Sequence, residues 1–390
     1  MNGRYTPEVE ATIGSVLFPF VGDSLGGSHV SALTLIDALP ALGIQPVVGL
    51  HQTDGLLAAH LESRGTPFEA LPPDNVVIGG PLPIELYFMQ RASVRLAPML
   101  RNRSWRFIHT NDARMHMTWT LAARRAGCAH VWHQRTINPS RRLGLYSWFP
   151  ARVLTISEFC RSGLPAAMAA RARVVDEPFD LPEMSNDVRA GHRRRLAQEL
   201  AIPPDAAIVG FVGNMEAQKR PEMFLKIAAL HTQRAGNNCH FVMIGDTRGF
   251  LTTERQAELQ RENLAGRVHL PGPCFPILPY MAGFDVLVAP GVGEGLGRTV
   301  IEAMLLSTVV IAADDGGHHD IVAHRKTGLL AGPDDAGDFA DQLSMLLGDR
   351  ELRTKLAEAG RTATHQRYDA HRHAAILAEI YGELASDIRH

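Results

Sequence analysis

Short apolar runs alternate along this chain with longer segments in which apolar residues recur at helical spacing. That alternation predicts parallel β/α units, in which each strand is followed by a helix that packs back on the sheet. In the first half we expect strands at residues 12–20, 46–50, 106–110, 130–134 and 152–157, and helices at 29–43, 56–65 and 117–127.

The same rhythm restarts in the second half. We expect strands at residues 207–213, 240–246, 267–272, 285–290 and 308–313, with a helix from Pro221 to His231. Pro221 suits a first helical turn, where its missing N–H would have no partner anyway. Between the halves, residues 176–200 begin with prolines and acids and show no strand pattern, which indicates a connection near residue 183.

These patterns predict an α/β protein with two Rossmann-like, doubly wound domains facing a central cleft. The expected domains are residues 1–183 and 184–370. A chain of 390 residues exceeds what one hydrophobic core usually serves, which agrees with two domains. In doubly wound sheets, ligands bind beyond the carboxyl ends of the strands, so candidate chemistry is sought there.

Composition narrows the function classes without choosing one. The formal net charge of -2 gives no reason to expect nucleic-acid binding. Four dispersed cysteines with no CxxC pair indicate neither a disulfide framework nor a zinc site. The first residues do not have the pattern of a secretory signal, and no run reaches the roughly 20 apolar residues that span a bilayer. We therefore expect a cytoplasmic protein.

Positive charge is concentrated in one stretch. Between Arg91 and Arg142 there are 11 arginines, no lysine and a single acid, Asp112. One interpretation is a solvated helical surface. The other is a docking surface for an anionic acceptor or for acidic lipid headgroups at the inner face of a membrane. Both interpretations stay open.

A glycine-rich loop follows the expected strand 285–290. Gly293, Gly295 and Gly297 allow a ligand to approach the backbone closely, and the start of the next helix is a natural seat for phosphate. Glu294 precedes that helix and Glu302 lies inside it. Such carboxylates can accept hydrogen bonds from sugar or ribose hydroxyls.

The spacing of these residues resembles the signature of the retaining GT-B glycosyltransferases of family four (glycosyl transferases group 1). The family has Glu, seven residues and a second Glu, followed by a diglycine loop and a Thr-Gly pair. The matching positions here are Glu294, Gly295, Gly297, Glu302, Ala303, Met304, Gly316, Gly317, Thr327 and Gly328. The resemblance implies that Glu302 binds the nucleotide ribose and that Glu294 holds the donor sugar and diphosphate.

A second segment, GFVGNMEAQKRPEMFL, resembles the family's donor-phosphate motif. The resemblance implies that Lys219 neutralises the departing diphosphate. Asn214 stands where the family has an arginine, so Arg220 or, better placed by sequence, Arg298 is expected to replace that cation. The implied donor-binding set is Gly26, Gly27, Gly213, Asn214, Arg220, Gly295, Leu296, Gly297, Arg298, Thr299 and Glu302, with Glu294, Lys219 and His133 as catalytic residues.

In the first half, Gly26 and Gly27 match a diglycine loop of the family. Their spacing from Gly22 is not the dinucleotide fingerprint, which argues against an oxidoreductase. The resemblance favours His133 over His109 as a residue that positions the sugar, although each also suits a hydrogen-bonded histidine at a strand end. His318, His319 and Asp320 could suggest a metal, but adjacent histidines do not share a direction and the family generally needs no metal.

The resemblance implies transfer of a hexose-type sugar from a nucleotide-diphosphate sugar, with retention of configuration, in cell-envelope or polysaccharide biosynthesis. No metal or other cofactor is expected. The partners are the donor and a sugar or lipid-linked acceptor, and the closing helix 371–390 is expected to cross back onto the first domain. Two alternatives remain: an epimerase or phosphorolytic enzyme on the same fold, and a non-catalytic nucleotide-sugar-binding protein.

Overall fold

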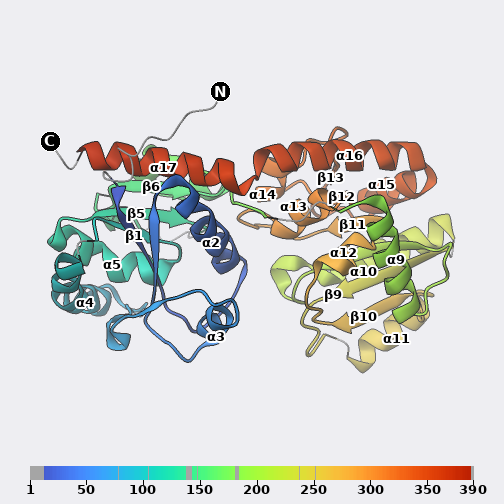
Figure 1. Ribbon diagram of the computed structural model, residues 1–390. Coiled ribbons are helices and arrows are strands. Elements are labelled where there is room, and N and C mark those ends of the chain that lie inside the picture. Colours follow the sequence, from blue (N-terminus) through green and yellow to red (C-terminus); the bar gives the residue numbers. More distant parts are fainter. Residues whose placement is uncertain are drawn as a thin grey trace. The chain divides into compact units, whose positions relative to one another are not determined.

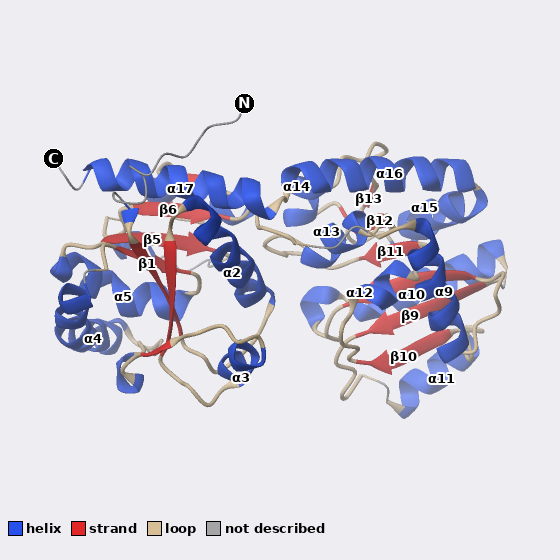
Figure 2. Cartoon of the chain, in the orientation of Figure 1, coloured by secondary structure: helices blue, strands red, loops and turns tan. Residues whose placement is uncertain are grey.

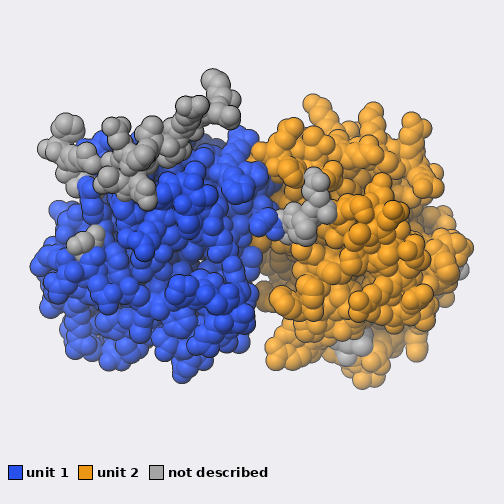
Figure 3. Space-filling model, in the orientation of Figure 1, with its two compact units in different colours: residues 1–180, 368–390 blue, residues 181–367 orange. Residues whose placement is uncertain are grey.

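The chain divides into two units in its computed structural model: unit 1 is Met1–Asp180 with Tyr368–His390, and unit 2 is Leu181–Arg367 (Figure 3). The structure describes residues 13–387 except 78, 104, 138–142, 147, 181–183, 237 and 251. Each unit has its own parallel sheet and its own hydrophobic core. Figure 2 shows strands flanked by helices in both units, as the alternating pattern predicts.

Unit 1 is built on parallel strands in the order β3-β2-β1-β4-β5-β6-β7. The strands are β1 (Ser15–Phe20), β2 (Gln45–Leu50), β3 (Glu69–Ala70), β4 (Phe107–Thr110), β5 (Ala129–Gln134), β6 (Arg152–Thr155) and β7 (Ala172–Val174). The helices are α2 (Gly27–Ala38), η1 (Leu39–Leu42), α3 (Leu56–Ser63), η2 (Pro73–Asn75), α4 (Leu82–Arg103), α5 (Ala113–Ala126), α6 (Leu143–Tyr146), α7 (Glu158–Ser162), α8 (Ala166–Ala169) and α17 (Ala370–Asp387).

Helices cover both faces of this sheet. Along β1, Val16, Phe18 and Phe20 join the core shared with α2, α3 and α17, whereas Leu17 joins the core under α4 and α5. This alternation is the two-residue period of a strand buried on both faces. α17 therefore belongs to unit 1, although it lies at the far end of the sequence (Figure 1).

Two helices of unit 1 differ clearly from their expected bounds. The helix expected at 117–127 is α5, which begins earlier, at Ala113, and the helix expected at 29–43 differs at its end. The pattern predicts a helix over 29–43, but α2 ends at Ala38 and a 3-10 turn, η1, continues to Leu42. Pro40 explains the change, because it has no N–H to continue the α-helical ladder. Gly43, with φ of 71°, then terminates the turn.

Unit 2 repeats the arrangement with the order β10-β9-β8-β11-β12-β13. Its strands are β8 (Ala207–Val212), β9 (Cys239–Ile244), β10 (Val268–Gly272), β11 (Val286–Ala289), β12 (Val309–Ala313) and β13 (Leu329–Ala331). Its helices are α9 (Asn186–Glu199), η3 (Ala217–Lys219), α10 (Pro221–Ala235), α11 (Thr253–Arg261), α12 (Leu278–Ala282), α13 (Arg298–Leu305), α14 (Gly317–Ile321), α15 (Ala336–Gly348) and α16 (Arg350–Arg367).

In both units the order of strands reverses beside the first strand. β1 lies between β2 and β4, and β8 lies between β9 and β11. At such a reversal the loops after two neighbouring strands run to opposite sides of the sheet and leave a crevice at its carboxyl edge. In unit 2 the two loops are those after β8 and β11, which carry Lys219 and Glu294.

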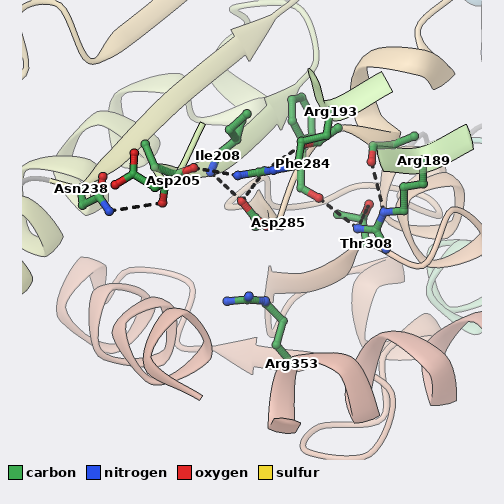
Figure 4. A network of polar contacts seen from close by, with 12 residues as sticks. Arg189, Arg193, Asp205, Ile208, Asn238, Phe284, Asp285, Thr308 and Arg353 are labelled. Carbon is green, nitrogen blue, oxygen red and sulfur yellow. Dashed lines mark hydrogen bonds and ion pairs between the residues drawn. The ribbon is translucent and has the colours of Figure 1, made fainter. Parts of the chain in front are cut away.

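The amino edge of the unit 2 sheet is closed by arginines of α9 (Figure 4). Arg193 donates to Asp285 Oδ2 at 2.6 Å and to the Ala206 carbonyl at 2.7 Å. Arg189 donates to the Phe284 carbonyl at 3.1 Å. Since Asp285 also accepts from Ile208 N–H at 2.8 Å, this network anchors α9 to the starts of the central strands.

Candidate functional site

Lys219 and Glu294 meet at the carboxyl edge of the unit 2 sheet. Lys219 Nζ lies 2.7 Å from Glu294 Oε2, although the residues are 75 positions apart. The lysine side chain is 28% exposed and the glutamate 10%, so the pair is reachable from solvent on the lysine side. The two motifs that the sequence predicts to act together are thus joined by an ion pair.

The backbones of the two loops are also bonded to each other. Val292 N–H donates to the Gln218 carbonyl at 3.0 Å, and the Gln218 side-chain amide donates to the Gly293 carbonyl at 2.8 Å. Gly213 has φ of 156°, and a Cβ there would lie 3.3 Å from Lys219 Cδ. The glycine therefore lets the lysine side chain lie across the end of β8.

A third loop, after β12, completes the site. Gly317 N–H donates to the Glu294 carbonyl at 2.8 Å, and Gly293 N–H donates to Asp315 Oδ1 at 2.5 Å. A Cβ on Gly317 would lie 2.5 Å from Leu296 Cα, so the diglycine loop needs its glycine for close packing. These contacts hold the glutamate loop from two sides.

His318 lies directly behind Glu294. Its Nε2 is 3.8 Å from Glu294 Oε1, and burial lowers the pKa of this histidine, so it is neutral at neutral pH. The neighbouring His319 is exposed and bonds Asp314 through Nδ1 at 2.6 Å. The two histidines point to different partners, and within the described part of the chain no group of three metal-ligating side chains is assembled.

Six further residues of the predicted donor-binding set lie at the start of α13: Gly295, Leu296 and Gly297 precede the helix, and Arg298, Thr299 and Glu302 lie within it. Gly297 has φ of 82° and precedes Arg298, where the helix begins. Arg298 Nη2 lies 3.3 Å from Glu302 Oε1, one turn further on. Leu296 is buried, while Gly295 and Thr299 are partly exposed. The N–H groups of a first helical turn have no acceptor within the helix, which makes this end a seat for an anion.

The two candidates for replacing the missing cation differ in direction. Arg220 turns toward the loop after β13, where it bonds the Pro333 carbonyl and lies 2.6 Å from Asp334 Oδ1. Asn214 instead joins the loops after β8 and β9, because its Oδ1 accepts from Asp246 N–H at 3.3 Å. Arg298 lies in the helix that follows the glutamate loop, and its role as the replacing cation stays a prediction.

In unit 1, Gly26 and Gly27 lie exposed at the start of α2. Gly26 has φ of -145°, and a Cβ there would meet only His29 Nδ1, at 4.0 Å. The glycine that this loop requires is Gly22, with φ of 100° and a Cβ that would lie 2.1 Å from the Gln52 carbonyl oxygen. Gly26 therefore has open space beside it. The turn depends instead on Gly22, which is not in the predicted set of site residues.

His133 and His109 are fully buried in a polar network of unit 1. His109 Nε2 lies 3.1 Å from His133 Nδ1, and His109 Nδ1 lies 2.6 Å from the Tyr381 hydroxyl on α17. Burial, reinforced by Arg135, lowers the pKa of both rings well below the usual value. His133 has no exposed surface in this structure. The observed geometry of both rings is therefore that of hydrogen-bonded histidines near the ends of strands.

Sequence reasoning missed the charged pair beside these histidines. Arg135 Nη1 lies 2.7 Å from Glu177 Oε1, and its Nε donates to Asn111 Oδ1 at 3.0 Å. Glu177 also accepts a hydrogen bond from Ser31. Arg135 follows β5 and Glu177 follows β7, so position after a strand was the available signal.

A cavity of about 230 Å³ opens at the same carboxyl edge of unit 1. Trp132, Met117, Leu143 and Val77 supply apolar lining, and Glu85 supplies a carboxylate. Glu85 accepts a hydrogen bond from the Tyr146 hydroxyl at 3.1 Å. A small ring with hydroxyl groups matches this mixture of apolar wall and hydrogen-bond acceptor.

Residues 192–363 match the sequence model of the family described as glycosyl transferases group 1. The chain is 27% identical over 236 residues to D-inositol 3-phosphate glycosyltransferase 2 of Catenulispora acidiphila, covering 58% of this chain and 54% of that protein. It is 29% identical over 237 residues to 2-deoxystreptamine glucosyltransferase of Streptomyces kanamyceticus, covering 60% of each. The matched regions span little more than half of these relatives.

Solved structures cover both units. HepE from Anabaena, in complex with UDP, has a TM-score of 0.76 at 21% identity, covering 95% of this chain and 100% of that one. A glycosyltransferase from Rickettsia africae has a TM-score of 0.78 at 17% identity, covering 95% and 98%. The chain is therefore similar to glycosyl transferases group 1 across its second unit and has the GT-B fold over both units.

Proposed function

We propose that this protein is a glycosyltransferase that moves a sugar from a nucleotide-diphosphate donor to a hydroxyl acceptor. The observation that carries the proposal is the 2.7 Å contact of Lys219 Nζ with Glu294 Oε2 at the reversal of strand order in unit 2. That reversal is where open α/β sheets bind nucleotides, and the contact unites two separate motifs there.

The residues divide the work on the donor. Lys219 would neutralise the diphosphate as it departs, and the first turn of α13 would hold its phosphate oxygens. Glu302 would accept hydrogen bonds from the ribose, next to Arg298. Glu294 would leave Lys219 and accept hydrogen bonds from sugar hydroxyls, so the ion pair is a donor-free arrangement of the same groups.

The proposed reaction forms a bond between the acceptor oxygen and the anomeric carbon and breaks the bond from that carbon to the phosphate oxygen. The diphosphate leaves with the electron pair, and the acceptor proton goes to a departing phosphate oxygen. Attack on the face that the diphosphate leaves retains the configuration. We propose retention and a hexose-type sugar from the motif resemblance; the anomeric coupling of the product, read by NMR, tests the retention.

The relatives suggest which substrates to try first. HepE was crystallised with UDP and with UDP-glucose, which supports uridine donors. Two relatives are named for inositol phosphate and for 2-deoxystreptamine, both hydroxylated six-membered carbon rings. We propose an acceptor of this kind, or a sugar of the cell envelope, bound by unit 1. We also propose that no bound metal is needed, so excess EDTA should leave turnover unchanged.

A ligand panel tests the proposal directly. UDP, GDP and ADP should be compared with their nucleosides by thermal shift, because a ligand that binds the folded state raises apparent stability. One diphosphate should stabilise the protein while its nucleoside does not, and the matching sugar nucleotide should then be hydrolysed slowly. Stabilisation without cleavage in any acceptor mixture would favour the non-catalytic alternative; no stabilisation by any diphosphate would contradict the proposal.

A further inference from the structure

Helix α4 of unit 1 presents an outward surface that combines arginines with apolar side chains. Its inward side is packed against α5 through Ala92, Leu96 and Leu100, and Met89 joins a neighbouring cluster that includes Met117 and Leu121 of α5. The outward side exposes the apolar residues Ile84, Leu86, Tyr87 and Val94 and the arginines Arg95 and Arg101, with Arg91 partly exposed. We call these seven residues the α4 surface. Figure 1 shows α4 beside α5 at the border of unit 1.

The outward side of α4 carries no acidic side chain. The single acid of α4 is Glu85, which is buried and bonded to the Tyr146 hydroxyl. Glu69 nearby is paired with Arg103, with 2.7 Å between the charged atoms. Asp74 in η2 is an exposed acid, and η2 adjoins α4. Along its length the helix therefore presents arginine charge without carboxylates of its own on the outside.

Two further exposed apolar residues adjoin the amino end of α4. The Tyr146–Glu85 hydrogen bond places α6 beside this end, and Leu145 on α6 is exposed. Trp148 follows and is 75% exposed, with the Arg171 guanidinium 5.9 Å from its ring centre. Tryptophan and tyrosine beside arginine are typical of side chains at the boundary between lipid headgroups and water.

We infer that the α4 surface docks on a lipid bilayer that carries anionic headgroups. The arginines match the negative lipid surface, and the aliphatic side chains among them would be buried at the headgroup boundary. A second copy of this chain suits the surface poorly, because a twofold contact would set arginines against arginines. Nucleic acid would leave Ile84, Leu86 and Val94 without partners.

Co-sedimentation of the full chain with vesicles tests the inference. At low ionic strength the protein should sediment with vesicles of phosphatidylcholine and phosphatidylglycerol and much less with phosphatidylcholine alone. Arg91→Gln/Arg95→Gln should weaken this binding by about 30-fold, since each arginine contributes roughly 5-fold at an anionic surface. The matched control Arg194→Gln/Arg195→Gln, on the exposed side of α9 in unit 2, should bind like the parent protein.

The apolar part is tested separately. Tyr87→Ser should weaken binding at both low and high salt, whereas the arginine variant should differ from the parent mainly at low salt. Trp148 is the exposed tryptophan among the four, so its emission should shift to the blue on vesicles, and Trp148→Phe should abolish that shift. Circular dichroism checks that the variants remain folded.

Three results would overturn the inference: equal binding to neutral vesicles, an equal loss in the α9 control, or binding to RNA with the same dependence on α4. The inference does not rest on the proposed function. Lys219→Ala should bind vesicles unchanged, so a failure of vesicle binding leaves the donor site standing, and a failure of the donor site leaves the α4 surface standing.

Discussion

Two ion pairs, one in each unit, have the same length and opposite surroundings. Arg135 and Glu177 in unit 1 are 1% and 2% exposed and 2.7 Å apart. Lys219 and Glu294 in unit 2 are also 2.7 Å apart, but the lysine is 28% exposed. Distance alone therefore does not distinguish a structural pair from one that can exchange its partner for a ligand.

The surroundings explain the difference. The partners of Arg135 are buried side chains that satisfy its donors in fixed directions. Lys219 extends past a glycine and ends on one carboxylate at the edge of the sheet. A buried pair is costly to break because it leaves an uncompensated charge, while a pair at a solvent-facing edge can separate when a stronger anion arrives. We expect unit 1's pair to stabilise the fold and unit 2's pair to act on substrate.

Among single substitutions, the largest effect on stability should come from breaking the buried pair. Arg135→Met should lower the free energy of unfolding of unit 1 by about 3–5 kcal/mol, because Glu177 would be left charged and buried. All four tryptophans lie in unit 1, so urea unfolding followed by tryptophan fluorescence reports this unit selectively. Arg173→Met, which removes an exposed arginine of the same unit, should cost less than about 1 kcal/mol. Similar losses of stability in both variants would contradict the claim that the buried pair stabilises unit 1.

Lys219→Ala should lower the activity and leave the stability nearly unchanged. The rate of transfer, kcat/KM, should fall by about 10²–10³-fold, because a cation opposite the departing diphosphate is lost. Thermal stability should change little, since the lysine is partly exposed. Lys226→Ala, an exposed lysine on α10, serves as the matched control and should keep full activity. A variant that is destabilised in proportion to its lost activity would show that Lys219 is structural.

Acid should unfold unit 1 through its buried histidines. Burial lowers the pKa of His130 and of His373 to about 3, and the pKa of His109, His116 and His133 is also well below 6.5. The unfolded chain binds more protons below pH 6.5, so this stability is present above pH 6.5 and is lost as pH falls. Between pH 7 and pH 5, His130 and His373 should each lower the free energy of unfolding by about 2 kcal/mol. Tryptophan-detected melting between pH 7 and 5 measures it; a flat profile would contradict the assignment.

The smallest expected effect compares two glycines. Gly297→Ala should destabilise unit 2 by about 1–3 kcal/mol, because φ is 82° and the new Cβ would lie 2.5 Å from His318 Cδ2. Gly26→Ala should change the stability of unit 1 by less than about 1 kcal/mol, because its φ of -145° suits any residue and no atom lies closer than 4.0 Å. Calorimetric melting of both variants decides; equal shifts would contradict the different roles.

The fold could be predicted from the sequence because each short apolar run, which forms a strand, is followed by a segment whose apolar residues recur at helical spacing. The resemblance to two family motifs also implied that Lys219 and Glu294 act on the same donor, and the structure brings the two side chains together. The end of α2 depends on Pro40, whose effect is local and can be predicted from the sequence. The fold and the pairing of the Lys219 and Glu294 loops could therefore be predicted from the sequence.

The direction of individual side chains was not accessible. Arg220 adjoins Lys219 in sequence, yet its backbone has φ of 55° and its guanidinium turns to Asp334. His133 lies near the end of β5 as expected, but its ring is enclosed and bonds His109 of β4 and Arg135, which follows β5. The Arg220–Asp334 and His109–His133 contacts join residues far apart in the chain, and no local period encodes them.

Titration calorimetry with the nucleoside diphosphate from the panel tests the central claim most directly. The account predicts that Lys219→Ala binds the diphosphate at least about tenfold more weakly than the parent protein, or about 1.4 kcal/mol. Lys226→Ala should match the parent, and weak binding of the nucleoside should be equal in all three. Unchanged affinity of Lys219→Ala for the diphosphate would contradict the claim that the Lys219 and Glu294 loops together bind it.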